Sequence, residues 1–235
     1  MTPNLDEIKG RSVLDQAMPW LAAIAVLCAG QGLSLLLKGA WPAVGETVWL
    51  VCLALQVAIR LPHSQRNRAN SIDGSANDLS EQLLLPAMFL TMLVLPMVAV
   101  ATPFLDFSAY SLPPIAKWAG TLLMLGFLWL FWRSHADLGR NWSARLEMHD
   151  AQVIVQTGVY ARLRHPMYAS IWLFAVAQPL LVQNLIGGLP ILCAFAAMYL
   201  IRVPREEAMM EARFGEDWRA YAARTTRILP RFIKS

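Results

Sequence analysis

The 235-residue sequence is poor in charged residues, which make up only 15% of it. A water-soluble domain usually carries about 25%. Hydrophobic residues reach 57%, and most of them lie in long runs between short polar connections. The scarcity of charge argues against an ordinary water-soluble domain and predicts an integral protein of a lipid bilayer.

Cysteine is also scarce, and its spacing argues against a metal site. Cys28, Cys52 and Cys193 each lie inside an apolar run, and none forms a CxxC pair. No metal site and no disulfide framework are therefore expected. Residues 1–20 carry mixed charges and lack a small-residue cleavage site, so no cleaved signal peptide is expected.

A basic stripe is missing as well, although the formal net charge is +4. The arginines lie in connections between apolar runs, which is where membrane topology places them. No basic row has interleaved aromatic residues, so nucleic acid is not an expected partner. No internal repeat is visible, which gives no support to an inverted-repeat transporter.

The apolar runs predict an all-α fold, a polytopic transmembrane helical bundle of about six membrane helices. Residues 1–133 are expected to supply four spans, at about 18–37, 44–59, 82–105 and 115–132. The polar segment 61–81 is expected to be a mobile loop. Residues 134–235 are expected to form a second region, with a tight helical hairpin at 167–203 and a cytosolic, helical cofactor-binding tail.

Proline interrupts the third run at Pro86 and Pro96, which are expected to break it. Prolines inside a span are tolerated when neighbouring helices satisfy the carbonyl groups that they free. The positions of basic residues predict the orientation. The first, third and fifth connections together contain only Lys38, whereas the second, the fourth and the tail are rich in arginine. Both termini and the site described next are therefore expected on the cytoplasmic side.

Two polar clusters flank the predicted hairpin, at residues 158–168 and from Arg202 to Glu207. Both ends of a tight hairpin emerge on the same membrane face, so the two clusters are expected to meet there. Their side chains suit a zwitterionic cofactor. Arginine or backbone N–H groups bind a carboxylate, and carboxylates or aromatic faces bind amino and sulfonium groups.

Each part of these clusters also has a purely structural interpretation. The Arg164-His165-Pro166 segment at the start of a span can serve as an interfacial anchor. The Glu206-Glu207 pair suits the first turn of a tail helix, whose positive end favours acids. The apolar stripe that follows, which ends at Tyr221, suits packing at least as well as cofactor binding.

At these residues the sequence resembles the isoprenylcysteine carboxyl methyltransferase family and the wider group of membrane methyltransferases that includes phospholipid methyltransferases. The pattern extends from about Leu138 to Arg231. It consists of Gly158-Val159-Tyr160, Arg164-His165-Pro166-Met167-Tyr168, Glu206-Glu207, Phe214-Gly215 with Trp218 and Tyr221, and Leu229-Pro230.

The resemblance implies a membrane methyltransferase that uses S-adenosyl-L-methionine and releases S-adenosyl-L-homocysteine. It implies a cofactor pocket built from Gly158, Val159, Tyr160, His165, Pro166, Tyr168, Glu206 and Glu207. It also implies catalytic roles for Arg164, Arg205 and Glu207, with one of the two arginines holding an acceptor carboxylate. The lipophilic acceptor would enter from the membrane. No metal is required, because methyl transfer is an in-line displacement that depends on alignment.

The acceptor itself stays open. Residues 138–143 differ from the corresponding segment of eukaryotic members, and the spans are fewer, which favours a bacterial inner membrane protein. The first hypothesis is isoprenylcysteine-type O-methylation of a carboxylate, and the alternative is a phospholipid or a small thiol. A relative of NADPH-dependent sterol-type reductases and a non-catalytic lipid-binding membrane protein are further alternatives. The sequence does not indicate an oligomeric state.

Overall fold

The computed structural model describes residues 13–67, 79–139 and 153–230, and every structural statement below refers to these. Within them the chain is helical and forms no strand, apart from two isolated β-bridges. The predicted all-α class is therefore confirmed. The elements are α2 (Val13–Lys38), α3 (Val44–Asn67), α4 (Leu79–Phe89), a π turn (Leu90–Val94), α5 (Leu95–Ala101), a 3-10 turn (Pro103–Ser108), α6 (Pro114–Leu138), a second 3-10 turn (Gly158–Ala161), α7 (Pro166–Val182), α8 (Leu185–Gly188), α9 (Pro190–Phe214) and α10 (Glu216–Arg224).

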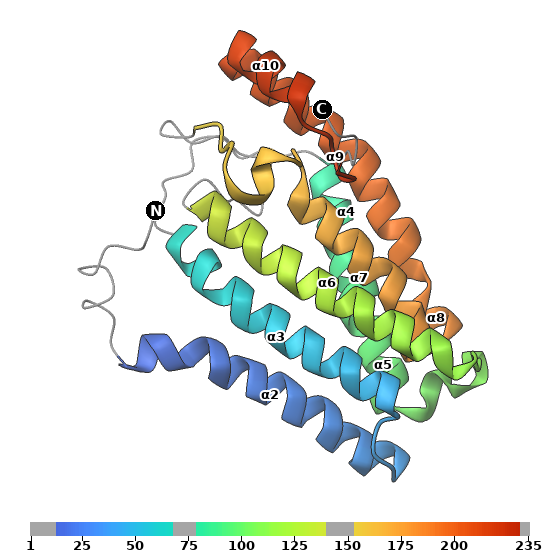
Figure 1. Ribbon diagram of the computed structural model, residues 1–235. Helices are drawn as coiled ribbons and strands as arrows, with labels where there is room; N and C mark the ends of the chain where they lie inside the picture. Colours follow the sequence, from blue (N-terminus) through green and yellow to red (C-terminus); the bar gives the residue numbers. More distant parts are fainter. Residues whose placement is uncertain (1–12, 68–78, 140–152, 231–235) are drawn as a thin grey trace.

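The long helices lie side by side in one bundle (Figure 1). Five segments are long and apolar enough to cross a membrane: Ala17–Lys38, Val44–Pro62, Gln82–Ala101, Pro114–Leu138 and Leu185–Phe214. The remaining apolar helix, α7, has 17 residues, fewer than the roughly 20 of a usual span. It lies within the bundle, and most of its side chains are buried. It pairs with α9 as the predicted hairpin, with the short α8 at the turn.

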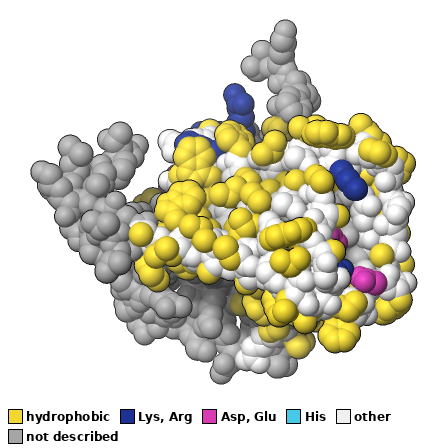
Figure 2. All heavy atoms as spheres, turned by 90° about the horizontal axis from the view of Figure 1, so that it is seen from below, with side chains coloured by type: hydrophobic (Ala, Val, Ile, Leu, Met, Phe, Trp, Pro, Cys, Tyr) yellow, Lys and Arg dark blue, Asp and Glu magenta, His cyan; other side chains and the backbone are white. Residues whose placement is uncertain are grey.

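The surface of the bundle is rich in large apolar side chains. Figure 2 shows hydrophobic groups over most of one face, with only a few charged groups among them. Helix α6 alone exposes Ile115, Trp118, Leu122, Leu125, Trp129 and Trp132. Apolar exposure on this scale is unfavourable in water and suits contact with lipid. The chain is therefore an integral membrane protein.

The third span continues through both of its prolines, contrary to the expectation that they break it. Helix α4 contains Pro86, and α5 has Pro96 in its first turn, with one π turn between the two helices. A π turn accommodates one extra residue per turn without ending the helix. The hydrogen-bond register is shifted there, because the Leu95 N–H donates to the Leu90 carbonyl.

This shift leaves the Thr91 carbonyl without its helical donor. The next residue in the π register is Pro96, which has no N–H group. The side chain of Gln178 on α7, which is fully buried, supplies the missing bond, with Nε2 donating to Thr91 O at 2.9 Å and to Gly187 O at 3.0 Å. Trp49 Nε1 donates to Gln178 Oε1 at 3.3 Å. A neighbouring helix thus satisfies the backbone group that proline frees.

A similar bond is made nearby, at the end of the bundle that carries α8. Pro103 cannot donate to the Ala99 carbonyl one turn earlier. Lys38, the last residue of α2, fills this position with Nζ donating to Ala99 O at 2.7 Å. The same ammonium group pairs with Asp106 Oδ1 at 2.9 Å.

Two predicted boundaries were wrong. The loop expected at 61–81 is helical at both ends, because α3 continues to Asn67 and α4 begins at Leu79; residues 68–78 lie outside the described part. The hairpin expected to end at residue 203 continues to Phe214, through Pro204. Once a helix is nucleated, each added residue gains a hydrogen bond, so polar composition and one proline do not end it. Helix α9 ends where Gly215 takes a left-handed φ of 53°.

Candidate functional site

The site begins at a glycine turn held against the end of α6. Gly158 has φ +61°, and a Cβ there would lie 2.1 Å from Asp137 Oδ2, so any other residue would be strained and would displace that carboxylate. The next residue, Val159, donates its N–H to Asp137 Oδ2 at 2.9 Å. Tyr160 OH contacts Ser134 O at 3.4 Å. Helix α6 therefore positions the three residues of the predicted Gly-x-Tyr turn.

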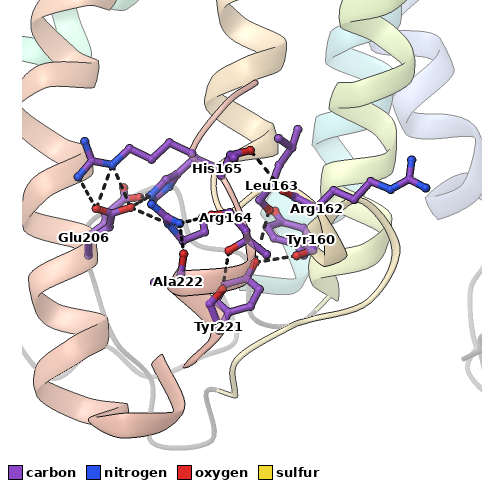
Figure 3. A network of polar contacts seen from close by, with 12 residues as sticks. Tyr160, Arg162, Leu163, Arg164, His165, Glu206, Tyr221 and Ala222 are labelled. Carbon is purple, nitrogen blue, oxygen red and sulfur yellow. Dashed lines mark hydrogen bonds and ion pairs between the residues drawn. The ribbon is translucent and has the colours of Figure 1, made fainter. Parts of the chain in front are cut away.

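The C-terminal segment folds back along the residues that precede α7. Arg164 N donates to Thr226 O at 2.7 Å, and His165 N donates to Arg227 O at 2.9 Å. Thr226 N donates in return to Arg162 O at 3.2 Å. These bonds form a short parallel bridge. They bring residues some sixty positions apart to one end of the bundle, together with the C-terminal part of α9 (Figure 3).

Glu207 on α9 is the centre of an ion-pair cluster at this end. Its Oε1 accepts from Arg164 Nε at 3.0 Å and lies 3.2 Å from His165 Nε2. Its Oε2 accepts from Arg227 Nη2 at 2.7 Å. The hydrogen bond to Glu207 raises the pKa of the Arg227 guanidinium. The predicted meeting of His165 with Glu207, across more than forty residues, is present.

Arg164 is bound on several sides. Besides Glu207, it donates through Nη1 to Ala222 O at 2.7 Å and to Thr225 O at 2.6 Å. These two carbonyl groups belong to the last turn of α10 and the residue after it, so the guanidinium caps that helix. Only 13% of the side chain is exposed. This geometry gives Arg164 a positioning role.

Glu206 lies next to Glu207 in sequence and shares His165 with it, but its other partners differ. Its Oε1 accepts from Tyr168 OH at 2.5 Å and lies 3.7 Å from Arg202 Nε. Its Oε2 lies 3.7 Å from His165 Nδ1. The Glu206 side chain is 28% exposed, compared with 16% for Glu207. Glu206 is therefore the more accessible of the two carboxylates.

Two tyrosines close the side of the site away from the bundle core. Tyr221 OH on α10 donates to Tyr160 O at 2.8 Å, and both side chains are buried. Burial raises the pKa of Tyr221 to about 12. Burial also raises the pKa of Tyr160. Both tyrosines thus remain protonated at neutral pH and act as structural hydrogen-bond donors.

The remaining predicted residues lie as follows. Pro166 is the first residue of α7, and the helix has no side-chain cap. Arg205 is on α9 and is exposed. Sequence reasoning did not choose Asp137, Arg202 or Arg227. The sequence does indicate Arg202, because it precedes Glu206 by one helical turn. Asp137 and Arg227 reach the site only through the fold. The described residues hold no cluster of His, Cys, Asp and Glu that could bind a metal ion.

The fold and this site define a polytopic helical membrane protein with a charged cluster at the open end of a helical hairpin. Residues 119–212 match the model of the isoprenylcysteine carboxyl methyltransferase (ICMT) family. Over that region the chain is similar to the ICMT family. The resemblance seen in the sequence is confirmed.

Known proteins show the same likeness. A probable protein-S-isoprenylcysteine O-methyltransferase of Oryza sativa subsp. indica is 26% identical over 94 residues, 39% of this chain and 49% of that protein. The cobalt-zinc-cadmium resistance protein CzcN of Cupriavidus metallidurans is 30% identical over 122 residues, 49% of this chain and 55% of that protein. The chain thus spans about half the length of the curated relatives it matches.

The fold is also that of a solved enzyme. The structure of the eukaryotic intramembrane Ras methyltransferase ICMT superposes with a TM-score of 0.51 at 16% sequence identity. The match covers 97% of this chain and 89% of that one. At this identity the likeness concerns the fold, and it extends over the N-terminal helices that the family model does not match.

Proposed function

We propose that the protein is an S-adenosyl-L-methionine-dependent methyltransferase that methylates a carboxylate of a lipophilic acceptor. The observation that carries the proposal is the meeting of His165 and Tyr168, at the start of α7, with Glu206 and Glu207 on α9. The family match and the names of the isoprenylcysteine methyltransferase relatives support it. We further propose that the protein belongs to a bacterial inner membrane and that its site faces the cytoplasm; the distribution of arginine supports this orientation.

The residues present fit the two ends of this cofactor. The first turn of α7 begins with Pro166 and carries no side-chain cap, so its backbone N–H groups are directed toward the space beside His165. Such donors suit a carboxylate. The partly exposed Glu206 carboxylate suits an amino group. Gly158, Val159 and Tyr160 form the adjacent turn, and Glu207 holds His165 in place.

Bound S-adenosyl-L-methionine supplies an electrophilic methyl group on a sulfonium, with S-adenosyl-L-homocysteine as the leaving group. The chain's own residues align the cofactor with the acceptor and enclose both. Arg164 fixes the C-terminal segment over the site through its bonds to Glu207 and the end of α10. A carboxylate acceptor is already a nucleophile, so no residue needs to remove a proton from it. Catalysis then consists of alignment and exclusion of water.

Binding of the cofactor can be tested on the full-length protein in nanodiscs. We expect calorimetry to give a Kd for S-adenosyl-L-methionine in the micromolar to millimolar range. Glu206→Gln is expected to weaken binding at least tenfold. The matched control is Glu211→Gln, which changes an exposed acid on the same helix. Stabilisation by NADPH and none by S-adenosyl-L-methionine would refute the proposal in favour of a reductase, and no binding of either would favour a non-catalytic role.

The acceptor class can be tested with a radiolabelled methyl donor. Native membranes that contain the protein are incubated with the donor, and the lipid extract is treated with base. A methyl ester releases volatile methanol, whereas N-methylated phospholipids and S-methylated thiols keep the label. Release of the label supports a carboxylate acceptor, and full retention contradicts it.

A further inference from the structure

Four aromatic rings form one cluster between α7 and α9, called here the aromatic quartet. It consists of Tyr168 and Trp172 on α7 with Phe195 and Tyr199 on α9. The members on each helix are four residues apart, so each pair lies on one helix face. The centroids of Trp172 and Phe195 are 5.0 Å apart, and those of Tyr168 and Tyr199 are 6.0 Å apart.

The quartet is continuous with the charged site. Tyr168 belongs to both, because its hydroxyl donates to Glu206 Oε1 at 2.5 Å. Its ring also lies edge-on to His165, with the centroids 5.6 Å apart. Helical side chains lean toward the N-terminus of their helix, so the indole of Trp172 leans back toward Tyr168 and the site.

Burial changes across the quartet. Tyr168 and Phe195 are buried, with 9% and 0% of their surface exposed. Trp172 and Tyr199 are only half-buried. Tyr199 lies within the candidate membrane span Leu185–Phe214. The quartet therefore connects Glu206 to aromatic side chains that are only half-buried.

One polar atom of the quartet has no partner. Trp172 Nε1 is buried and has no hydrogen bond to any residue in the described part of the chain. A buried donor without an acceptor costs about 1–3 kcal/mol, and such atoms in folded proteins call for a specific explanation. Tyr168, by contrast, is satisfied by Glu206. A ligand oxygen that reached the indole would relieve this cost.

We propose that the aromatic quartet is the subsite for the methyl acceptor. The apolar chain of the acceptor packs against the four rings, and an oxygen at its reactive end accepts a hydrogen bond from Trp172 Nε1. Tyr199, which is half-buried and lies near Arg227, contacts the acceptor at the charged end of the quartet. This inference rests on the proposed function and deepens it, because it assigns residues to the acceptor rather than to the cofactor.

The test uses the full-length protein in nanodiscs and N-acetyl-S-farnesyl-L-cysteine as the probe. Trp172→Phe keeps a ring and removes the donor, so affinity for the probe should fall about tenfold. The Kd for S-adenosyl-L-methionine should change less than about twofold in the same sample, which also reports that the site is folded. Trp129→Phe, at an exposed position on α6, is the matched control and should leave both affinities unchanged.

A second variant guards against a local packing defect. Tyr199→Leu removes one ring of the quartet without touching the indole, and we expect it to weaken binding of the farnesyl probe and of N-acetyl-S-geranyl-L-cysteine alike. Equal probe affinity in wild type and Trp172→Phe would overturn the inference while leaving the proposed function intact. A wild-type protein that binds the probe but not S-adenosyl-L-methionine would instead refute the proposed function, and loss of the probe in Trp172→Phe would then show a lipid-binding site that serves no methyl transfer.

Discussion

Arg164 and Arg227 bind the same carboxylate from environments of different burial, which allows a direct comparison of their contributions to stability. Arg164 donates to Glu207 and two backbone carbonyls, and only 13% of its side chain is exposed. Arg227 donates to Glu207 through Nε and Nη2 and is 50% exposed. Removing one partner of a buried pair costs about 3–5 kcal/mol. An exposed pair contributes about 0–1 kcal/mol.

We therefore expect Arg164→Ala to lower the free energy of unfolding by about 3 kcal/mol, at the low end of the buried range because Arg227 still compensates Glu207. Arg227→Ala should lower it by less than about 1 kcal/mol. Arg164→Lys should lie between them, since an ammonium group cannot reproduce the planar fork of donors. Unfolding by SDS in mixed micelles, followed by circular dichroism, measures all three. Equal losses for the two alanine variants would refute the burial argument.

Three further changes test how the fold is held together. Gln178→Leu should destabilise the bundle by about 1–2 kcal/mol, because it removes the donor to the carbonyl freed by the π turn. In the same SDS titration, no change would show that the carbonyl is satisfied in another way. Gly158→Ala should cost about 1–3 kcal/mol through its left-handed φ and the contact with Asp137, whereas Gly32→Ala, which meets no neighbouring atom, is the control. Lys38→Met should cost about 1 kcal/mol by removing the donor to Ala99; a loss that vanishes in high salt would assign the effect to the ion pair with Asp106 instead.

Periodicity and composition predicted the helical class well, because a bilayer imposes long apolar runs on a chain. They failed where helices leave the apolar region. Helix α9 continues through Pro204 to Phe214, because its backbone hydrogen bonds continue although its residues change from apolar to polar. The polar end of α3 continues to Asn67 for the same reason.

The site was predictable only in part. His165 and Glu207 could be paired from sequence, because a tight hairpin returns its two ends to one face. Arg227 and Asp137 could not, since they reach the site through a folded-back tail and the end of α6. No local pattern encodes these contacts. These contacts arise from the packing of distant segments in the folded chain, which one sequence alone does not show.

The two adjacent glutamates have separate tasks, and this separation gives the last prediction. Neighbouring residues on a helix point about 100° apart, so Glu207 faces Arg164 and Arg227 while Glu206 faces Tyr168 and Arg202, and His165 lies between the two acids. Glu207 is bound by Arg164, His165 and Arg227 and is the less exposed.

We therefore assign Glu207 to the folded arrangement of the site and Glu206 to ligand binding. Glu207→Gln should lower the free energy of unfolding by about 2–4 kcal/mol, because it leaves the buried Arg164 guanidinium without its counter-charge. Glu206→Gln should change it by less than about 1 kcal/mol while weakening S-adenosyl-L-methionine binding. Measuring unfolding and calorimetric binding on both variants separates the two effects. If Glu206→Gln unfolds the protein as readily as Glu207→Gln, the two acids form one structural unit and the assignment is wrong.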